Sequence, residues 1–217
     1  PKSQMLRFHS QTAGSTLTAQ QPDCNVARVT IQALASVLGG TQSLHTNSKD
    51  EALGLPTVDA ATLALRTQQI IAHESGVTDY IDPLAGSYVI ETLTDQLEEK
   101  ASEYIQQIDD QGGAVAAIEN GFQEQFIQDA AYQFQKAVES DEAIVVGVNR
   151  FEIEDEAPTD PLKLNPQVQS EQIKRLNALK ISRASEPVES TLNRLKQAAQ
   201  GSENLMPRIL DCVRVNT

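Results

Sequence analysis

Polar side chains are concentrated in two short segments that we predict to be strands. The first covers residues 5–12 and includes His9; the second covers residues 41–47 and includes His45 and Asn47. Strands covered on both faces in α/β proteins are normally rich in Val, Ile and Leu. A buried polar group must be hydrogen-bonded to protein, water or ligand. The pattern favours a ligand that passes these strands. The alternative is a polar core whose side chains hydrogen-bond to one another.

The spacing within each segment groups these side chains by strand face. His9 and Gln11 are two residues apart and therefore share a face. In the second segment Ser43, His45 and Asn47 share one face, and the intervening residues share the other. Alternation alone does not tell which face points inward.

Carboxylates and an amide follow directly after the second predicted strand, at Asn47, Asp50 and Glu51. Catalytic and binding groups of parallel barrels gather at the carboxyl ends of the strands. A carboxylate there can accept hydrogen bonds from ribose hydroxyls, as in dinucleotide-binding folds. Helix capping by Asp50 or Asn47 is an equally simple interpretation.

Other kinds of chemistry find little support in the sequence. His9 and His45 lack a third ligand at diagnostic spacing, so we expect no metal site. There is no nucleophile elbow and no glycine-rich phosphate loop. Cys24 and Cys212 are far apart without a CxxC spacing, which favours free thiols.

The composition excludes several classes of partner. The net charge is −13, with 30 acidic and 17 basic residues, which disfavours nucleic acid and anionic lipid. No run of eighteen apolar residues is available for a membrane span. The chain begins at Pro1 without an initiator Met or signal peptide, so we expect a cytoplasmic protein and the cut end of a longer chain.

Apolar periodicity predicts strands alternating with helices, and thus an α/β fold with parallel strands. Helices are expected over residues 25–38, 58–74, 114–120 and 123–139, together with one that follows the loop at 82–87 and ends near residue 111. A buried parallel strand is expected over 143–148. After residue 151 an acidic, proline-rich linker is predicted over 152–166. Helices near 167–182 and 187–200 and the start of another then form a tail over 167–217, leaving 1–151 as the first domain.

A long ordered series of short motifs resembles one enzyme family. The series includes RFHSQTAG at 7–14, GGTQSLHTN at 39–47, LPT at 55–57 and GVN at 147–149. It is similar to the large subunits of adenosylcobalamin-dependent acyl-CoA mutases of the methylmalonyl-CoA mutase type. The similarity is dense over about 5–151 and loose in the tail.

The resemblance implies the C-terminal part of a (β/α)₈ TIM barrel, followed by a helical tail. The pantetheine chain of an acyl-CoA would run along the barrel axis, with cobalamin at the C-terminal face. The family is an isomerase, an intramolecular transferase that interconverts methylmalonyl-CoA and succinyl-CoA by a radical carbon-skeleton rearrangement. The cofactor supplies the difficult chemistry and the protein binds, orients and shields.

The resemblance also suggests roles for five residues. His9, as catalytic residue, and Gln42 would contact the thioester and pantetheine of the substrate. Gln11 would lie near the corrin and adenosyl group, and Asn47 and Glu51 would bind the adenosyl ribose. Positioning of this kind is worth several kcal/mol without acid–base catalysis.

Some of the family's pattern is missing from the chain. The first half of the barrel and the DxHxxG signature that supplies the cobalt ligand are absent, so we expect the chain alone to be inactive. A cobalamin-binding domain or subunit, and assembly as a dimer or heterodimer, are implied.

The acyl substrate is left open by Phe8, which resembles the isobutyryl-CoA and 2-hydroxyisobutyryl-CoA mutase branches. A non-catalytic partner-binding module is an alternative for these residues taken alone. An unrelated barrel enzyme such as an aldolase is disfavoured because no Lys stands at a strand end.

Overall fold

The computed structural model describes residues 7–154, 162–163 and 165–217. The chain divides into two compact units, Pro1–Leu162 and Lys163–Thr217, each of which is described by itself. The predicted strand over 5–12 begins outside the described residues. Most of the predicted linker over 152–166 also lies outside them.

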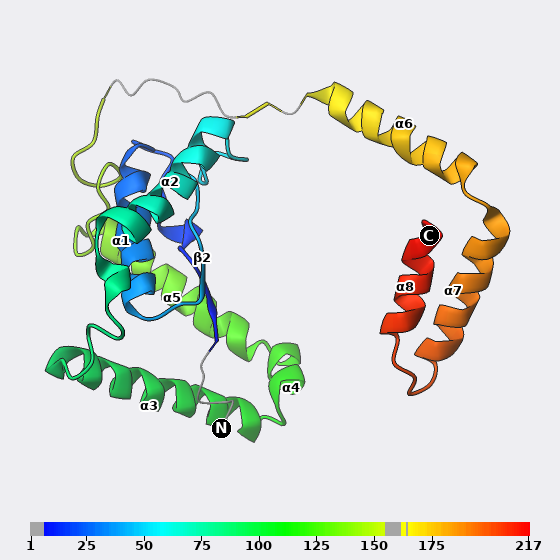
Figure 1. The fold of residues 1–217 in the computed structure, drawn as a ribbon. Coiled ribbons are helices and arrows are strands. Elements are labelled where there is room, and N and C mark those ends of the chain that lie inside the picture. The colour runs from blue at the N-terminus through cyan, green and yellow to red at the C-terminus, as the bar shows by residue number, and fades with distance from the viewer. Residues whose placement is uncertain (1–6, 155–161, 164) are drawn as a thin grey trace. The chain divides into compact units, whose positions relative to one another are not determined.

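The centre of the first unit is a β–α–β arrangement (Figure 1). Strands β1 (His9–Gln11) and β2 (Ser43–His45) pair in parallel, and α1 (Cys24–Leu38) connects them. Parallel neighbours require such a crossover. The α/β class is therefore confirmed, with a small parallel sheet among helices, and the wider barrel stays a prediction.

Helix α2 (Val58–Glu74) packs against α1 and begins and ends where the periodicity predicts. Val29 and Ala33 of α1 are buried, as are Ala60 and Ile71 of α2. The Thr57 hydroxyl accepts a hydrogen bond from the amide of Ala60 at 3.2 Å, so it caps the helix at its first turn.

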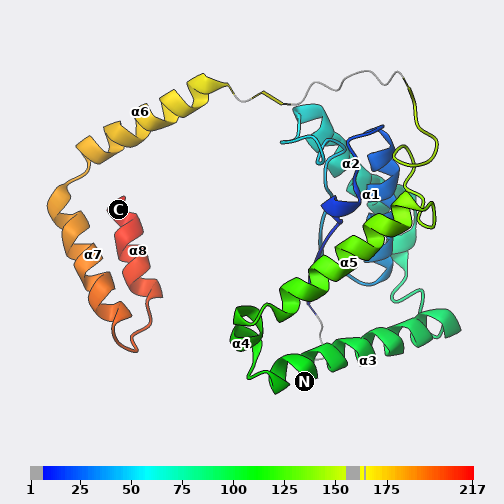
Figure 2. The same cartoon turned by 180° about the vertical axis from the view of Figure 1, so that it is seen from behind.

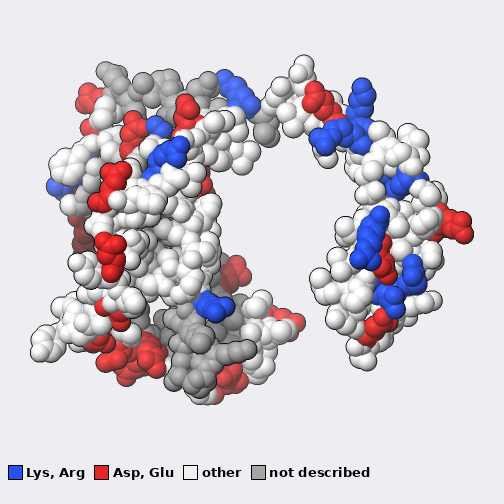
Figure 3. All heavy atoms as spheres, viewed as in Figure 1, with Lys and Arg blue, Asp and Glu red and all other residues white. Residues whose placement is uncertain are grey.

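Three helices follow in the first unit: α3 (Tyr88–Asp110), α4 (Ala114–Glu119) and α5 (Phe122–Glu139). They correspond to the three predicted helices, and α4 packs against both neighbours (Figure 2). The rings of Tyr104 and Phe126 meet edge to face with centroids 5.3 Å apart, which joins α3 to α5. Acidic side chains gather over α3 (Figure 3).

The prediction of a buried parallel strand over residues 143–148 is wrong. Ile144 is 53% exposed, and the segment forms a turn with one isolated bridge, from Val146 to Arg150. Asn149 holds the turn, because its side chain accepts from the Val145 amide and donates to the Ala143 carbonyl, both at 2.8 Å. These local hydrogen bonds replace the sheet partners that an apolar run would need.

The second unit consists of α6 (Pro166–Ser182), α7 (Ser185–Ala199) and α8 (Met206–Arg214). All three predicted tail helices are confirmed. Helices α7 and α8 pack together and bury Val188, Ala198 and Cys212. In the described parts of both units, no helix combines the length and apolar character that crossing a membrane requires.

Candidate functional site

The exposed face of the two-stranded sheet carries a row of polar side chains. His9 stands opposite Ser43 and Gln11 opposite His45, and all four residues are exposed. The other face is covered by α2, whose Gln68 side chain donates to the Leu44 carbonyl at 3.1 Å. The structure thus answers what alternation left open, and the His9 face points away from α2.

His9 is held by a cross-strand contact on this face. Its Nδ1 lies 2.7 Å from the hydroxyl oxygen of Ser43. A hydrogen bond to one ring nitrogen fixes the plane of the ring. It also selects the tautomer, which decides whether the other nitrogen donates or accepts. His9 Nε2 has no hydrogen-bond partner within the described residues, so it remains available to a ligand.

Gln42 uses its side-chain amide to fasten the start of the sheet. Its Oε1 accepts from the Phe8 amide at 2.7 Å, and its Nε2 donates to the Gly40 carbonyl at 3.2 Å. The side chain is exposed, but both of its polar ends already bind backbone groups. Contact between Gln42 and a substrate stays a prediction.

Asn47 and Glu51 come together just beyond the carboxyl ends of both strands. Asn47 is 3% exposed, and Thr12, directly after β1, bonds to it at 2.9 Å. A Cβ added to Gly14 would lie 3.0 Å from Asn47 Nδ2 and 3.4 Å from Glu51 Oε1. Gly14 therefore packs closely against an amide donor and a carboxylate acceptor, and a larger side chain there would collide with both.

Asp50 lies between these residues in sequence but has a structural role. Its Oδ2 accepts from the Thr57 amide at 2.9 Å and the Thr57 hydroxyl at 3.2 Å, which ties the loop to the start of α2. Burial acts to raise the pKa of Asp50, but the nearby Ser48 hydroxyl and the hydrogen bonds from Thr57 outweigh burial and lower the pKa. The carboxyl is therefore a charged cap near neutral pH, and of the two acids only Glu51 is exposed.

A fully buried asparagine, Asn25, joins the loops that follow the two strands. Its Nδ2 donates to the carbonyls of Thr18 at 2.9 Å and Lys49 at 2.8 Å. Its Oδ1 accepts from the Thr18 amide at 3.1 Å and from Arg28 at 2.7 Å. Lys49 stands between Asn47 and Glu51, so Asn25 supports the loop that carries both.

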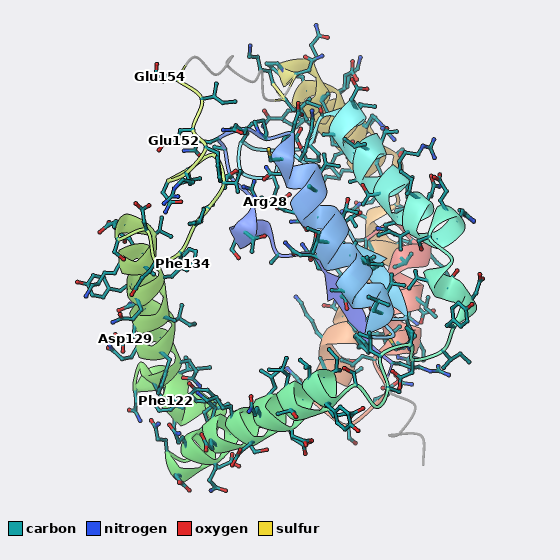
Figure 4. The ribbon with its side chains drawn as sticks, turned by 90° about the vertical axis from the view of Figure 1, so that its left-hand side faces the viewer. Arg28, Phe122, Asp129, Phe134, Glu152 and Glu154 are labelled. Carbon is teal, nitrogen blue, oxygen red and sulfur yellow. The ribbon has the colours of Figure 1, made fainter. Side chains whose placement is uncertain are left out.

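Arg28 is occupied within the protein. Besides Asn25, its guanidinium donates to the Thr18 hydroxyl at 3.0 Å and to the Val146 carbonyl at 2.7 Å. Figure 4 shows Arg28 on α1, toward the segment that leads to Glu152. The guanidinium therefore joins α1 to the turn after α5, and we assign it no ligand phosphate.

Three residues of the site region received no functional role from sequence reasoning: Thr12, Gly14 and Asn25. Gly14 was visible only as a turn signal and Thr12 only as one of several polar residues in a strand. Asn25 gave no signal, because an asparagine near a helix start normally indicates a cap. Within the described residues, no three His, Cys, Asp or Glu side chains converge as metal ligands would.

Comparison with known proteins places the whole chain in one group. The family model described as methylmalonyl-CoA mutase matches residues 1–217. The methylmalonyl-CoA mutase of Escherichia coli is 47% identical over 216 residues, which are 99% of this chain and 30% of that protein. The 2-hydroxyisobutanoyl-CoA mutase large subunit of Aquincola tertiaricarbonis is 44% identical over 99% of this chain and 38% of that subunit. A probable mitochondrial methylmalonyl-CoA mutase of Caenorhabditis elegans is 44% identical over 98% of this chain and 29% of its own length.

Proposed function

The chain belongs to the methylmalonyl-CoA mutase family, and we propose that it forms part of an adenosylcobalamin-dependent isomerase that interconverts methylmalonyl-CoA and succinyl-CoA. The observation that carries the proposal is the Asn47–Glu51 pair around Gly14, at the strand ends. Because the chain spans 30% of the Escherichia coli protein and 38% of the Aquincola tertiaricarbonis subunit, the reaction belongs to a complete mutase that contains residues 1–217. We expect the chain alone to show no turnover.

The exposed polar face of the sheet would line the path of the acyl-CoA. On a closed barrel this face, opposite α2, becomes the lumen. His9 would offer Nε2 to the thioester carbonyl oxygen, and the Ser43 contact would hold the ring at that angle. Gln42 would border the pantetheine chain while it fastens the strand start.

The strand-end cluster would hold the adenosyl part of the cofactor. Asn47 Nδ2 and Glu51 Oε1 both lie close to Gly14 at the strand ends, and a ribose hydroxyl can both accept from an amide and donate to a carboxylate. The residues therefore fit the group, and Gln11, on the exposed sheet face, would lie nearer the corrin. Bound adenosylcobalamin supplies the homolytic cobalt–carbon chemistry. The cobalt ligand would come from another domain or subunit, within a dimer or heterodimer.

A second substrate is favoured by one residue. Phe8, half-buried at the start of β1, is the feature that resembles the isobutyryl-CoA and 2-hydroxyisobutyryl-CoA branches. The similarity to a 2-hydroxyisobutanoyl-CoA mutase large subunit agrees with this alternative. In that case the chain is part of a large subunit that works with a separate corrinoid-binding subunit.

The test is turnover by the complete mutase with adenosylcobalamin and a panel of three acyl-CoA thioesters. Formation of succinyl-CoA from methylmalonyl-CoA is the expected result. Preference for 2-hydroxyisobutyryl-CoA or isobutyryl-CoA would select the alternative. If the complete protein isomerises none of the three and binds no corrinoid, the proposed function is wrong.

A further inference from the structure

We infer that Thr12 is a positioning residue, whose buried hydroxyl fixes the orientation of the Asn47 side-chain amide toward a nucleoside ribose. The inference rests on the proposed function, because the ligand is the adenosyl group named there. Thr12 and Asn47 are each 3% exposed, although they stand 35 residues apart in the chain. Their contact joins the ends of β1 and β2.

Two hydrogen bonds close a ring between these residues. The Asn47 backbone amide donates to the Thr12 hydroxyl oxygen at 2.9 Å, and that hydroxyl donates to Asn47 Oδ1, also at 2.9 Å. A hydroxyl has a single hydrogen to donate. With that hydrogen on Oδ1, the amide oxygen faces Thr12 and Nδ2 takes the opposite position, toward Gly14.

Thr12 is itself held rigidly. Its backbone amide donates to the His45 carbonyl at 3.1 Å, which extends the β1–β2 ladder by one residue. The hydroxyl position thus follows from the sheet register, and the orientation of Asn47 is set by the sheet.

The orientation of the Asn47 amide determines which of its atoms lies beside Gly14. With the oxygen on Thr12, Asn47 Nδ2 lies 3.0 Å from the place where a Gly14 Cβ would stand, and Glu51 Oε1 lies 3.4 Å from the same point. Nδ2 has no acceptor within the described residues. An inverted amide would put its oxygen beside the Glu51 carboxylate and remove the donor that a ribose hydroxyl needs.

The test uses two substitutions of Thr12 in the complete mutase and one control. Thr12→Val keeps the shape and removes the hydroxyl, whereas Thr12→Ser keeps the hydroxyl. The control is Thr46→Val, since Thr46 is 6% exposed and its hydroxyl donates to the Ala64 carbonyl at 2.8 Å. The control removes a buried hydroxyl of the same loop without touching Asn47.

The first measurement compares affinity for adenosylcobalamin with affinity for hydroxocobalamin, which lacks the adenosyl group. We expect Thr12→Val to weaken adenosylcobalamin binding by about tenfold and to leave hydroxocobalamin binding within about twofold. Thr12→Ser should restore the wild-type ratio, and Thr46→Val should not change it. A wild-type ratio in Thr12→Val, or an equal loss in Thr12→Ser, would overturn the inference.

The second measurement needs no cofactor. Hydrogen exchange of the Asn47 backbone amide should be at least about tenfold faster in Thr12→Val than in wild type, and close to wild type in Thr12→Ser. Unchanged exchange in Thr12→Val would refute the Thr12–Asn47 bond whatever the corrinoids do. If exchange follows the hydroxyl but the wild-type protein binds both corrinoids equally, the bond stands and the ribose assignment fails, whereas the proposed function fails only if the complete mutase also turns over none of the three thioesters.

Discussion

Replacing Asn25 with Asp tests whether one buried amide holds the two site loops together. Asn25 is 0% exposed, and its Nδ2 donates to the carbonyl oxygens of Thr18 and Lys49. An ionised carboxylate has no hydrogen to donate and would face both carbonyl oxygens as an acceptor. The interactions of Oδ1, including the one with Arg28, would persist.

The expected loss follows from those contacts. Each buried carbonyl left without its donor costs about 1–3 kcal/mol, and Arg28 would recover part of this by facing a negative charge. We therefore expect the free energy of unfolding to fall by about 2–4 kcal/mol, a large share of a typical total of about 5–15 kcal/mol.

Urea unfolding followed by tyrosine fluorescence measures this change in the first unit, because all four tyrosines lie in residues 80–132 and the chain has no tryptophan. Asn120→Asp is the matched control, because Asn120 is exposed and the substitution adds the same negative charge to the same unit. A difference below about 0.5 kcal/mol between the two variants would refute the reasoning.

Three further predictions concern the site and its support. Gly14→Ala should weaken adenosylcobalamin binding by the complete mutase about tenfold or more, because the new methyl group meets the amide nitrogen of Asn47 at 3.0 Å and would displace it; unchanged affinity in a titration would contradict the role assigned to Asn47. Asp50→Asn should lower stability by about 1 kcal/mol at neutral pH. Because the folded pKa of Asp50 lies below 3.8, its contribution is present above that value and lost as the pH falls through the folded pKa, so urea unfolding should show the variant and wild type converging well below pH 3.8. Ser43→Ala should reduce kcat about tenfold by freeing the His9 ring, with Ser43→Thr restoring it; a kcat unaffected by the loss of the hydroxyl would show that the contact is incidental.

The helices were predictable because local signals agree with the packing. The α2 boundaries follow from an apolar face and from Thr57 at the cap position, and both signals are local in sequence. The segment over 143–148 was predicted wrongly because there the local signal disagrees with the structure. Its apolar, β-branched run predicts a strand, but Asn149 satisfies the backbone through a turn, a side-chain effect outside the periodicity.

The candidate site was predictable only in part. Alternation correctly placed His9 and Gln11 on one face of a strand, and Glu51 was expected just past a strand end. The support from Thr12 and Asn25 was not predictable, because it depends on the register of β1 against β2 and on contacts between loops distant in the chain. Hydrogen-bond partners so far apart leave no periodic trace in a single sequence.

The most direct measurement for the central claim is a structure of the complete mutase with adenosylcobalamin and a substrate analogue bound. We expect the ribose hydroxyls to lie within hydrogen-bonding distance of Asn47 Nδ2 and a Glu51 carboxylate oxygen, beside Gly14. His9 Nε2 should face the thioester oxygen. If another part of the protein covers Asn47 Nδ2 and Glu51 while the adenosyl group binds elsewhere, the role assigned to this strand-end cluster is wrong.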